Sequence, residues 1–351
     1  MLSNKKDFYR YAGDPLQVCG IKEYQLLNGK AKGVRAFDVK NGSGLEFTVL
    51  PDRCLDFSSL SFKGVNCTLL GKTGVTTPDW RDTDNFFRGF YAGFLTTCGL
   101  RNVGGGCEDA GEKFGIHGRI SNIPAEDVCA STEWVDGVPE MTISGRMRES
   151  AFFAENMMLE RKIVCRYGEN KFRICNTVEN IGFRPEKLMY LMHFNMGYPF
   201  LDEGSYMMAE TKKLLPRDPE AEKGVNDYFL AEKPQHAYAE QVFYHELFAD
   251  AEGRTMVAFV NPKLEIALSL SFSKKQFPLF THWKQMGEGE YVFGMEPCNC
   301  YVGGRGDARN EGLVTEMEPF EKRQFDVEVT LYDGKAEIRE LEAYMKKNLV
   351  F

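Results

Sequence analysis

The chain has 351 residues, of which 43% are hydrophobic and 27% are charged, as in an ordinary soluble globular protein. This composition excludes extended disorder, a collagen-like fibre and a membrane bundle, and no stretch approaches the eighteen consecutive apolar residues of a membrane span. The net charge of −8, from 51 acidic and 43 basic residues, argues against nucleic acid as a partner.

Alternation of apolar and polar residues predicts β-strands along most of the chain. Antiparallel hairpins are expected within residues 34–50, 134–148 and 159–178, with turns at 41–42, 136–137 and 167–170. Two further strands, at 264–272 and 325–331, are predicted to have one wet face and one dry face. Strands at this spacing favour a sandwich or barrel over alternating strands and helices.

Helical periodicity is scarce. The clearest case is residues 338–345, which are predicted to form a C-terminal helix that packs as a cap. Residues 211–237 are polar, contain three prolines and are interpreted as a long surface excursion. The sequence therefore predicts an all-β fold, a single domain over 1–351, built as a large twisted antiparallel double sheet with few short helices.

The ten cysteines show no paired C-x-x-C spacing, so no zinc or other metal site is expected. No signal peptide is recognised at the N-terminus, which predicts a cytoplasmic protein with reduced, mostly buried thiols. The glycine-rich run at 104–106 lacks the remainder of a dinucleotide fingerprint, and no Walker lysine follows it. No cofactor is expected.

Two of the five histidines stand in contexts that favour a binding site. His117 lies between Gly115 and Gly118, where the backbone can approach a ligand closely, although a hydrogen-bonded turn histidine would explain it equally well. His193 and Asn195 share one face of a predicted strand whose other face is apolar. A satisfied histidine on an exposed sheet face is the alternative there.

Glu296 and Trp283 occur close together near the C-terminal end. Glu296 ends an apolar strand before a proline and could be a partly desolvated base, although an ordinary strand-end acid explains it better when it is taken alone. Trp283 offers an indole face for a sugar, although most tryptophans belong to a core.

Arg53 follows another strand, within residues 50–56. Its guanidinium could donate a forked pair of hydrogen bonds to adjacent hydroxyls. It could equally pair with Asp52 or Asp56 and hold a corner, and the local pattern slightly favours this structural role.

Together these segments resemble the galactose mutarotase-like superfamily, the aldose 1-epimerases. Within it they are most similar to a branch named only as a domain of unknown function or by its likeness to aldose 1-epimerases. The matching segments run through most of the chain: residues 50–56, 97–100, 116–119, 191–199, 283–284 and 294–297. The resemblance implies a β-supersandwich of mostly antiparallel strands, in agreement with the periodicity.

The resemblance also implies catalytic roles for three residues. His117 matches the family histidine that holds sugar hydroxyls or the ring oxygen, and His193 matches the general acid on the ring oxygen. Glu296 matches the general base at the anomeric hydroxyl. Which of the two histidines is the acid stays open.

Substrate-binding residues are carried over less completely. The usual Asn-Arg stretch ahead of the first histidine is replaced by Arg101-Asn102 and three glycines, and the sugar-binding aspartate has no clear counterpart. Asp202 is a candidate only because it follows the His193 strand. The residues expected to bind substrate are Arg53, Asn195, Arg119, Trp283 and Asp202.

The implied function is interconversion of the anomers of a free sugar by acid/base catalysis, which needs no metal, redox group or nucleotide. The expected partner is a small carbohydrate, with neither nucleic acid nor membrane, and both a monomer and a homodimer are compatible with the sequence. One alternative is a non-catalytic carbohydrate-binding protein. Another is an epimerase, lyase or hydrolase acting on a modified or phosphorylated sugar, for which cations are available in four arginines, Arg81, Arg88, Arg101 and Arg119.

Overall fold

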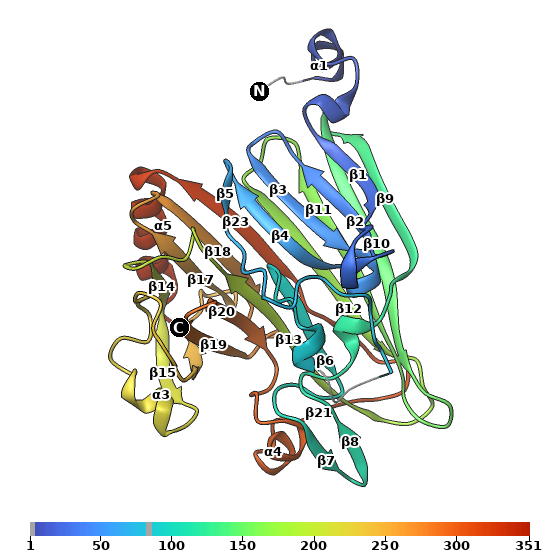
Figure 1. Ribbon diagram of the computed structural model, residues 1–351, viewed down its shortest axis with the longest axis vertical. Coiled ribbons are helices and arrows are strands. Elements are labelled where there is room, and N and C mark those ends of the chain that lie inside the picture. Colours follow the sequence, from blue (N-terminus) through green and yellow to red (C-terminus); the bar gives the residue numbers. More distant parts are fainter. Residues whose placement is uncertain (1–3, 82–85) are drawn as a thin grey trace.

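The alternating side chains form strands throughout the molecule. The computed structural model describes residues 4–81 and 86–351, which fold into two large antiparallel sheets and a small two-stranded one (Figure 1). Within these residues, no helix is both long and apolar enough to cross a membrane.

The first sheet has twelve strands and carries most of the residues considered below. From one edge to the other its strands are β1 (Gly20–Gln25), β2 (Arg35–Lys40), β3 (Leu45–Leu50), β4 (Asp56–Phe62), β6 (Leu95–Leu100), β13 (Glu186–Met196), β20 (Glu290–Cys298), β19 (Leu279–Gly287), β16 (Gln241–Leu247) and β15 (Thr211–Pro216). The short strands β5 (Val65–Asn66) and β21 (Thr315–Met317) pair with β4 and β13 respectively.

The second sheet has nine strands and lies behind the first (Figure 1). Its order is β14 (Tyr206–Ala209), β17 (Arg254–Asn261), β18 (Ile266–Ser273), β23 (Val327–Asp333), β12 (Lys171–Asn180), β11 (Asn156–Arg166), β10 (Val138–Ser150) and β9 (Glu126–Val135), with β22 (Lys322–Gln324) beside β12. The separate hairpin consists of β7 (Cys107–Asp109) and β8 (Glu112–Phe114).

Helices are few, and the longest of them, α5 (Lys335–Asn348), packs on one face of the second sheet. The others are α1 (Lys5–Tyr11), α2 (Phe86–Gly89), α3 (Pro219–Lys223) and α4 (Arg305–Asn310). Four short 3-10 turns lie at Pro15–Gln17, Gly29–Ala31, Pro51–Arg53 and Ile120–Asn122. The predicted C-terminal helix is therefore confirmed, and its buried residues Ile338, Leu341 and Met345 pack on the second sheet.

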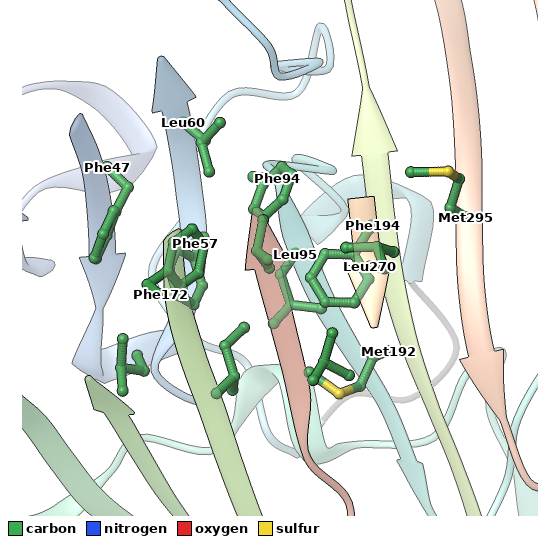
Figure 2. Packing of buried hydrophobic residues seen from close by; sticks show 14 of the residues in the cluster. Phe47, Phe57, Leu60, Phe94, Leu95, Phe172, Met192, Phe194, Leu270 and Met295 are labelled. Atoms are coloured by element: carbon green, nitrogen blue, oxygen red, sulfur yellow. The ribbon is translucent and has the colours of Figure 1, made fainter. Parts of the chain in front are cut away.

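The core lies between the two sheets (Figure 2). Phe57 of the first sheet stacks on Phe172 of the second with 5.4 Å between ring centroids, and Phe47 lies 4.8 Å from the same ring. Burial of each such side chain contributes about 1.5–3 kcal/mol. One buried ion pair also joins the sheets, because Nη1 of Arg161 lies 2.7 Å from Oδ1 of Asp56.

The predicted all-β architecture and all three hairpins are confirmed. Two expectations need correction. The strand predicted at 264–272 begins at Ile266 and is buried on both faces, because α5 covers the face on which Ala267 lies. Residues 211–237 are not a plain surface excursion, since they form β15 and α3.

Candidate active site

Side chains from distant parts of the chain meet in a cavity of about 340 Å³ on the first sheet. His193 of β13, Trp283 of β19 and Glu296 of β20 line it, and His117 reaches it from the loop after β8. The full lining is Phe86, Phe87, Phe90, Gly104, Gly105, Ile116, His117, His193, Arg217, Glu240, Val242, Trp283, Glu296 and Val302. The three residues predicted to be catalytic thus converge, together with Trp283.

His193 and Glu296 are cross-strand neighbours. Their neighbours Phe194 and Met295 point into the core, so His193 and Glu296 point away from it. The register that sets Phe194 opposite Met295 also sets His193 opposite Glu296. Nε2 of His193 lies 3.2 Å from Oε1 of Glu296, and that oxygen has no aligned hydrogen-bond donor among the described residues.

Gly294 makes the close approach of these two groups possible. It lies two residues before Glu296 on the same face of β20. A Cβ atom at this position would lie 2.7 Å from Oε1 of Glu296 and 3.4 Å from Cε1 of His193. The carboxylate of Glu296 therefore occupies the space that a side chain at position 294 would fill.

Burial drives this pair toward its uncharged form. Desolvation raises the pKa of Glu296 well above its ordinary value, with the nearby Glu240 adding to the rise. Desolvation lowers the pKa of His193 to about 3, and the neighbouring His117 adds to the fall. Burial therefore favours a carboxylic acid beside a neutral imidazole over the ion pair.

His117 is fixed by the glycine-rich segment around it. Its backbone N–H donates to the carbonyl of Gly104 at 2.9 Å, and its Nδ1 accepts from the N–H of Gly104 at 3.2 Å. Burial lowers the pKa of His117 to about 4, so the ring is neutral at neutral pH. Because Nδ1 accepts, the proton lies on Nε2, and His117 is a hydrogen-bond donor.

Only glycine fits at position 104. Its φ is +81°, and a Cβ atom there would lie 1.8 Å from the carbonyl oxygen of Val302. This loop therefore crosses residues 302–304 at backbone distance, with a β-bridge between Gly104 and Gly303. The close contact with residues 302–304 positions the backbone N–H of Gly104. This N–H donates to Nδ1 of His117 and so sets the tautomer of the ring.

Aromatic rings enclose the two imidazoles. The His193 ring lies 5.3 Å from Trp283 and 5.8 Å from both Phe90 and His117, measured between centroids. Phe86 lies 5.1 Å from His117. These apolar surfaces exclude water and cause the desolvation that shifts both histidine pKa values.

Two residues at the mouth of the cavity were not predicted. Glu240 accepts from Nε1 of Trp283 at 2.8 Å and from Nη1 of Arg217 at 3.1 Å. Arg217 also donates to Asp218 at 2.7 Å. The residues directly follow β15 and directly precede β16, and no periodicity marks them in the sequence. One usable signal was that each adjoins the end of a strand.

Arg53, predicted to bind substrate, does not reach the cavity. It is buried, and it donates to the carbonyl oxygens of Ser121, Thr76 and Gly89 at 3.0–3.1 Å. The corner-holding role is thus the one that the contacts support, although the partners are carbonyls instead of Asp52 or Asp56. Two of these carbonyls flank the segment that carries Phe86 and Phe87.

Three other predicted binding residues also lie outside the lining. Asn195 is buried and donates to the carbonyl oxygens of Gly93 and His193, both at 3.0 Å. Arg119 lines a different hollow beside Glu155, and Asp202 pairs with Lys263 at 2.7 Å. Each side chain points away from the cavity because its hydrogen-bond or ion-pair partner lies elsewhere. The position of a residue in its strand does not reveal that partner.

The cavity can therefore offer an acid/base pair, one N–H donor, a carboxylate at its mouth and an indole face. Among residues 4–81 and 86–351, no group of three or more His, Cys, Asp or Glu side chains is arranged to hold a metal ion.

The fold has solved relatives. A putative aldose 1-epimerase from Klebsiella pneumoniae superposes with a TM-score of 0.88 at 24% identity, over 94% of this chain and 88% of that one. A galactose mutarotase-like protein from Clostridium acetobutylicum gives 0.63 at 14% identity, over 90% and 99%. Galactose 1-epimerase from Lactobacillus acidophilus gives 0.56 at 14%, over 90% and 99%. At these identities the likeness establishes the galactose mutarotase-like fold.

No curated protein matches the chain. Residues 31–331 match the sequence profile of a family described as a domain of unknown function, DUF4432. This match spans most of the chain and is consistent with the branch that the sequence motifs resemble. The protein belongs to the DUF4432 family and has the galactose mutarotase-like fold.

Proposed function

We propose that the protein is an aldose 1-epimerase that interconverts the anomers of a free, uncharged sugar. The observation that carries the proposal is the 3.2 Å separation of His193 Nε2 and Glu296 Oε1 inside the cavity. Ring opening removes a proton from the anomeric hydroxyl and adds one to the ring oxygen. These two oxygens share one carbon, so an acid and a base must act side by side, as this pair does.

The proton transfer follows from the pair's electrostatics. The pair reacts from its ion-pair form, which it reaches when Glu296 passes its proton to Nε2 of His193 across the 3.2 Å between them. The Glu296 carboxylate then takes the proton of the anomeric hydroxyl while the His193 imidazolium gives its proton to the ring oxygen. The ring bond breaks, and the pair is left as carboxylic acid and neutral imidazole. Burial favours this product state, because it raises the pKa of Glu296 and lowers that of His193. Rotation of the aldehyde and the reverse transfers give the other anomer.

The remaining lining residues are assigned to binding. His117 donates its Nε2–H to a sugar oxygen, and the indole of Trp283 covers a C–H face. The carboxylate of Glu240 keeps lone pairs for sugar hydroxyls after it accepts from Trp283 and Arg217.

The charge of the cavity favours a neutral sugar over a phosphorylated one. Among the described lining residues, Arg217 is the one arginine, and it is already paired with two carboxylates, those of Asp218 and Glu240. The four arginines considered for a phosphate, at 81, 88, 101 and 119, do not line it. A dianionic group would therefore find no free positive charge on the part of the lining that the structure describes.

The test is polarimetry of freshly dissolved single anomers across a panel of neutral aldoses and their 6-phosphates. We expect a rate well above the spontaneous one for a neutral sugar, and a loss of about 10²–10⁴-fold on Glu296→Gln or His193→Asn. A matched control is His236→Asn, since His236 is an exposed histidine outside the cavity, and its rate should not change.

Rates unaltered by both substitutions would overturn the assignment. Sugar-dependent thermal stabilisation of the wild type without any rate would instead identify a carbohydrate-binding protein. Melting temperatures of the variants show whether a lost rate reflects lost folding.

A further inference from the structure

Four phenylalanines form an exposed patch on the β10–β11 turn, the β12–β13 turn and the segment that follows β21. We call Phe152, Phe153, Phe183 and Phe320 the phenylalanine patch. The first three are the most exposed large apolar side chains among residues 4–81 and 86–351, at 88%, 89% and 86%. Phe320 is 55% exposed. Apolar clusters of this kind mark interaction surfaces.

The turns that carry the patch are tied to one another. Nη2 of Arg184 donates to the carbonyl oxygen of Phe153 at 2.9 Å, which joins the β10–β11 turn to the β12–β13 turn. The N–H of Phe320 donates to the carbonyl of Asn180 at 2.6 Å, and its ring lies 5.4 Å from that of Phe183. The rings are thus presented on a preformed surface.

A hollow of about 380 Å³ opens within the same patch, and Phe153 and Phe183 line it. Charged side chains, including Arg101 and Glu155, lie at its base, and they are paired with each other at 3.1 Å. Phe152 stands beside the hollow without lining it, and its ring contacts Phe153 at 4.3 Å between centroids. The patch therefore holds both a projecting ring and a recess.

We propose that the patch is a two-fold contact between two copies of this chain, in which Phe152 of each copy enters the hollow of the other. A two-fold axis through the patch would place the projecting ring of each copy over the recess of the other, so that one surface serves both partners.

The area that the phenylalanine patch can bury agrees with a second copy of the chain as its partner. An aromatic side chain buries about 150–250 Å². With their observed exposures, the four rings supply roughly 500–800 Å² per copy, close to the about 800 Å² per partner of a standard stable interface.

A membrane is the less favourable partner for the same rings. The chain carries a net charge of −8. Anionic lipid surfaces repel such a protein, and basic residues would be needed to hold it there.

The test is sedimentation equilibrium of the full chain between about 0.1 and 50 µM. Against a monomer of 39.9 kDa, we expect wild type to be a dimer in this range. Phe152→Ser and Phe183→Ser should each raise the dissociation constant about 30-fold or more, as for buried aromatic anchors. Because both residues are on exposed turns, their thermal unfolding should stay close to wild type.

Tyr11→Ser is the matched control, since Tyr11 is a 76% exposed aromatic on α1 and should leave the dimer intact. A monomeric wild type at 50 µM would overturn the proposal, and so would a dimer that both phenylalanine substitutions leave unchanged. A monomer that co-sediments with lipid vesicles through these rings would also overturn it and identify a membrane surface.

Discussion

At the scale of single residues, the absence of a side chain at Gly294 is as important to the candidate site as the side chains of His193 and Glu296. The carboxylate of Glu296 occupies the volume that a Cβ atom would take, at 2.7 Å. The backbone at this position has no positive φ, so an alanine would fit the strand and disturb only its neighbours. A substitution at Gly294 therefore tests the arrangement of His193 and Glu296 without a large change in the stability of the fold.

Gly294→Ala should lower kcat by about 100-fold with little loss of folding, because a displacement near 1 Å of a catalytic group costs about that factor. The measurement is the polarimetric rate together with the melting temperature. Gly13→Ala is the control, since a Cβ atom there meets nothing within 4 Å. A Gly294→Ala rate equal to that of wild type would show that Glu296 tolerates displacement and would weaken its role as base.

The positions of His193 and Glu296 on one face could be predicted because alternation within a strand fixes the side of the sheet. Asn195 shares that face, yet its amide turns to carbonyls and not to the cavity. Glu240 and Arg217 could not be predicted, because they lie beyond strand ends and meet only when β15 pairs with β16. Their partners, not their sequence context, set their direction.

At the scale of elements, the buried pair Arg161–Asp56 joins β11 of one sheet to β4 of the other. Arg161 also donates to Asn176 and to Thr97, each at 2.7 Å, and the N–H of Thr97 donates to Asp56 at 2.7 Å. Every charged atom of the pair therefore has a partner in a dry interior. Such a network tolerates the loss of one member poorly.

Arg161→Met should reduce the free energy of unfolding by about 3–5 kcal/mol, because it leaves the Asp56 carboxylate buried without a counter-charge. Urea unfolding measures this loss. The double variant Asp56→Asn, Arg161→Met should recover a substantial part of it. A single variant as stable as wild type would mean that water or another cation reaches Asp56.

The hairpins could be predicted since their partners are adjacent in sequence. The order of the sheets could not, because β6, β13 and β20 meet across more than eighty residues at each step. The second buried face of β18 also escaped prediction: Ala267 and Ser269 are small enough to lie under a covering element, yet they resemble a solvent-facing set.

At the scale of the whole molecule, buried titratable groups make stability depend on pH in both directions. Burial raises the pKa of Glu149 to about 7, so its stabilising contribution is complete below about pH 4.5 and is lost as the pH rises through 7. Burial lowers the pKa of His245 to about 3, so its contribution is present above about pH 6.5 and is lost as the pH falls toward 3. Between about pH 4.5 and 6.5 the two effects offset each other, so the free energy of unfolding should be greatest in that range.

Glu149→Gln should therefore stabilise the protein at about pH 8 relative to wild type, by roughly 3 kcal/mol, and have little effect near pH 4. Glutamine keeps an oxygen for the N–H of Leu100, which donates to Glu149 at 3.0 Å. Urea unfolding at both pH values measures the difference, and Glu246→Gln on an exposed side chain is the control. Equal effects at the two pH values would contradict the assignment.

The residues of the cavity come from two parts of the first sheet. His193 and Glu296 lie on its central strands, and the residues at the mouth lie beside its edge. Glu296 and His193 belong to central strands, where any backbone change would disturb the core. Arg217 and Glu240 stand at the outer margin, beside segments that can change in length at small cost. If the proposed function is correct, changes in length at this margin would alter which sugar is admitted and leave His193 and Glu296 in place.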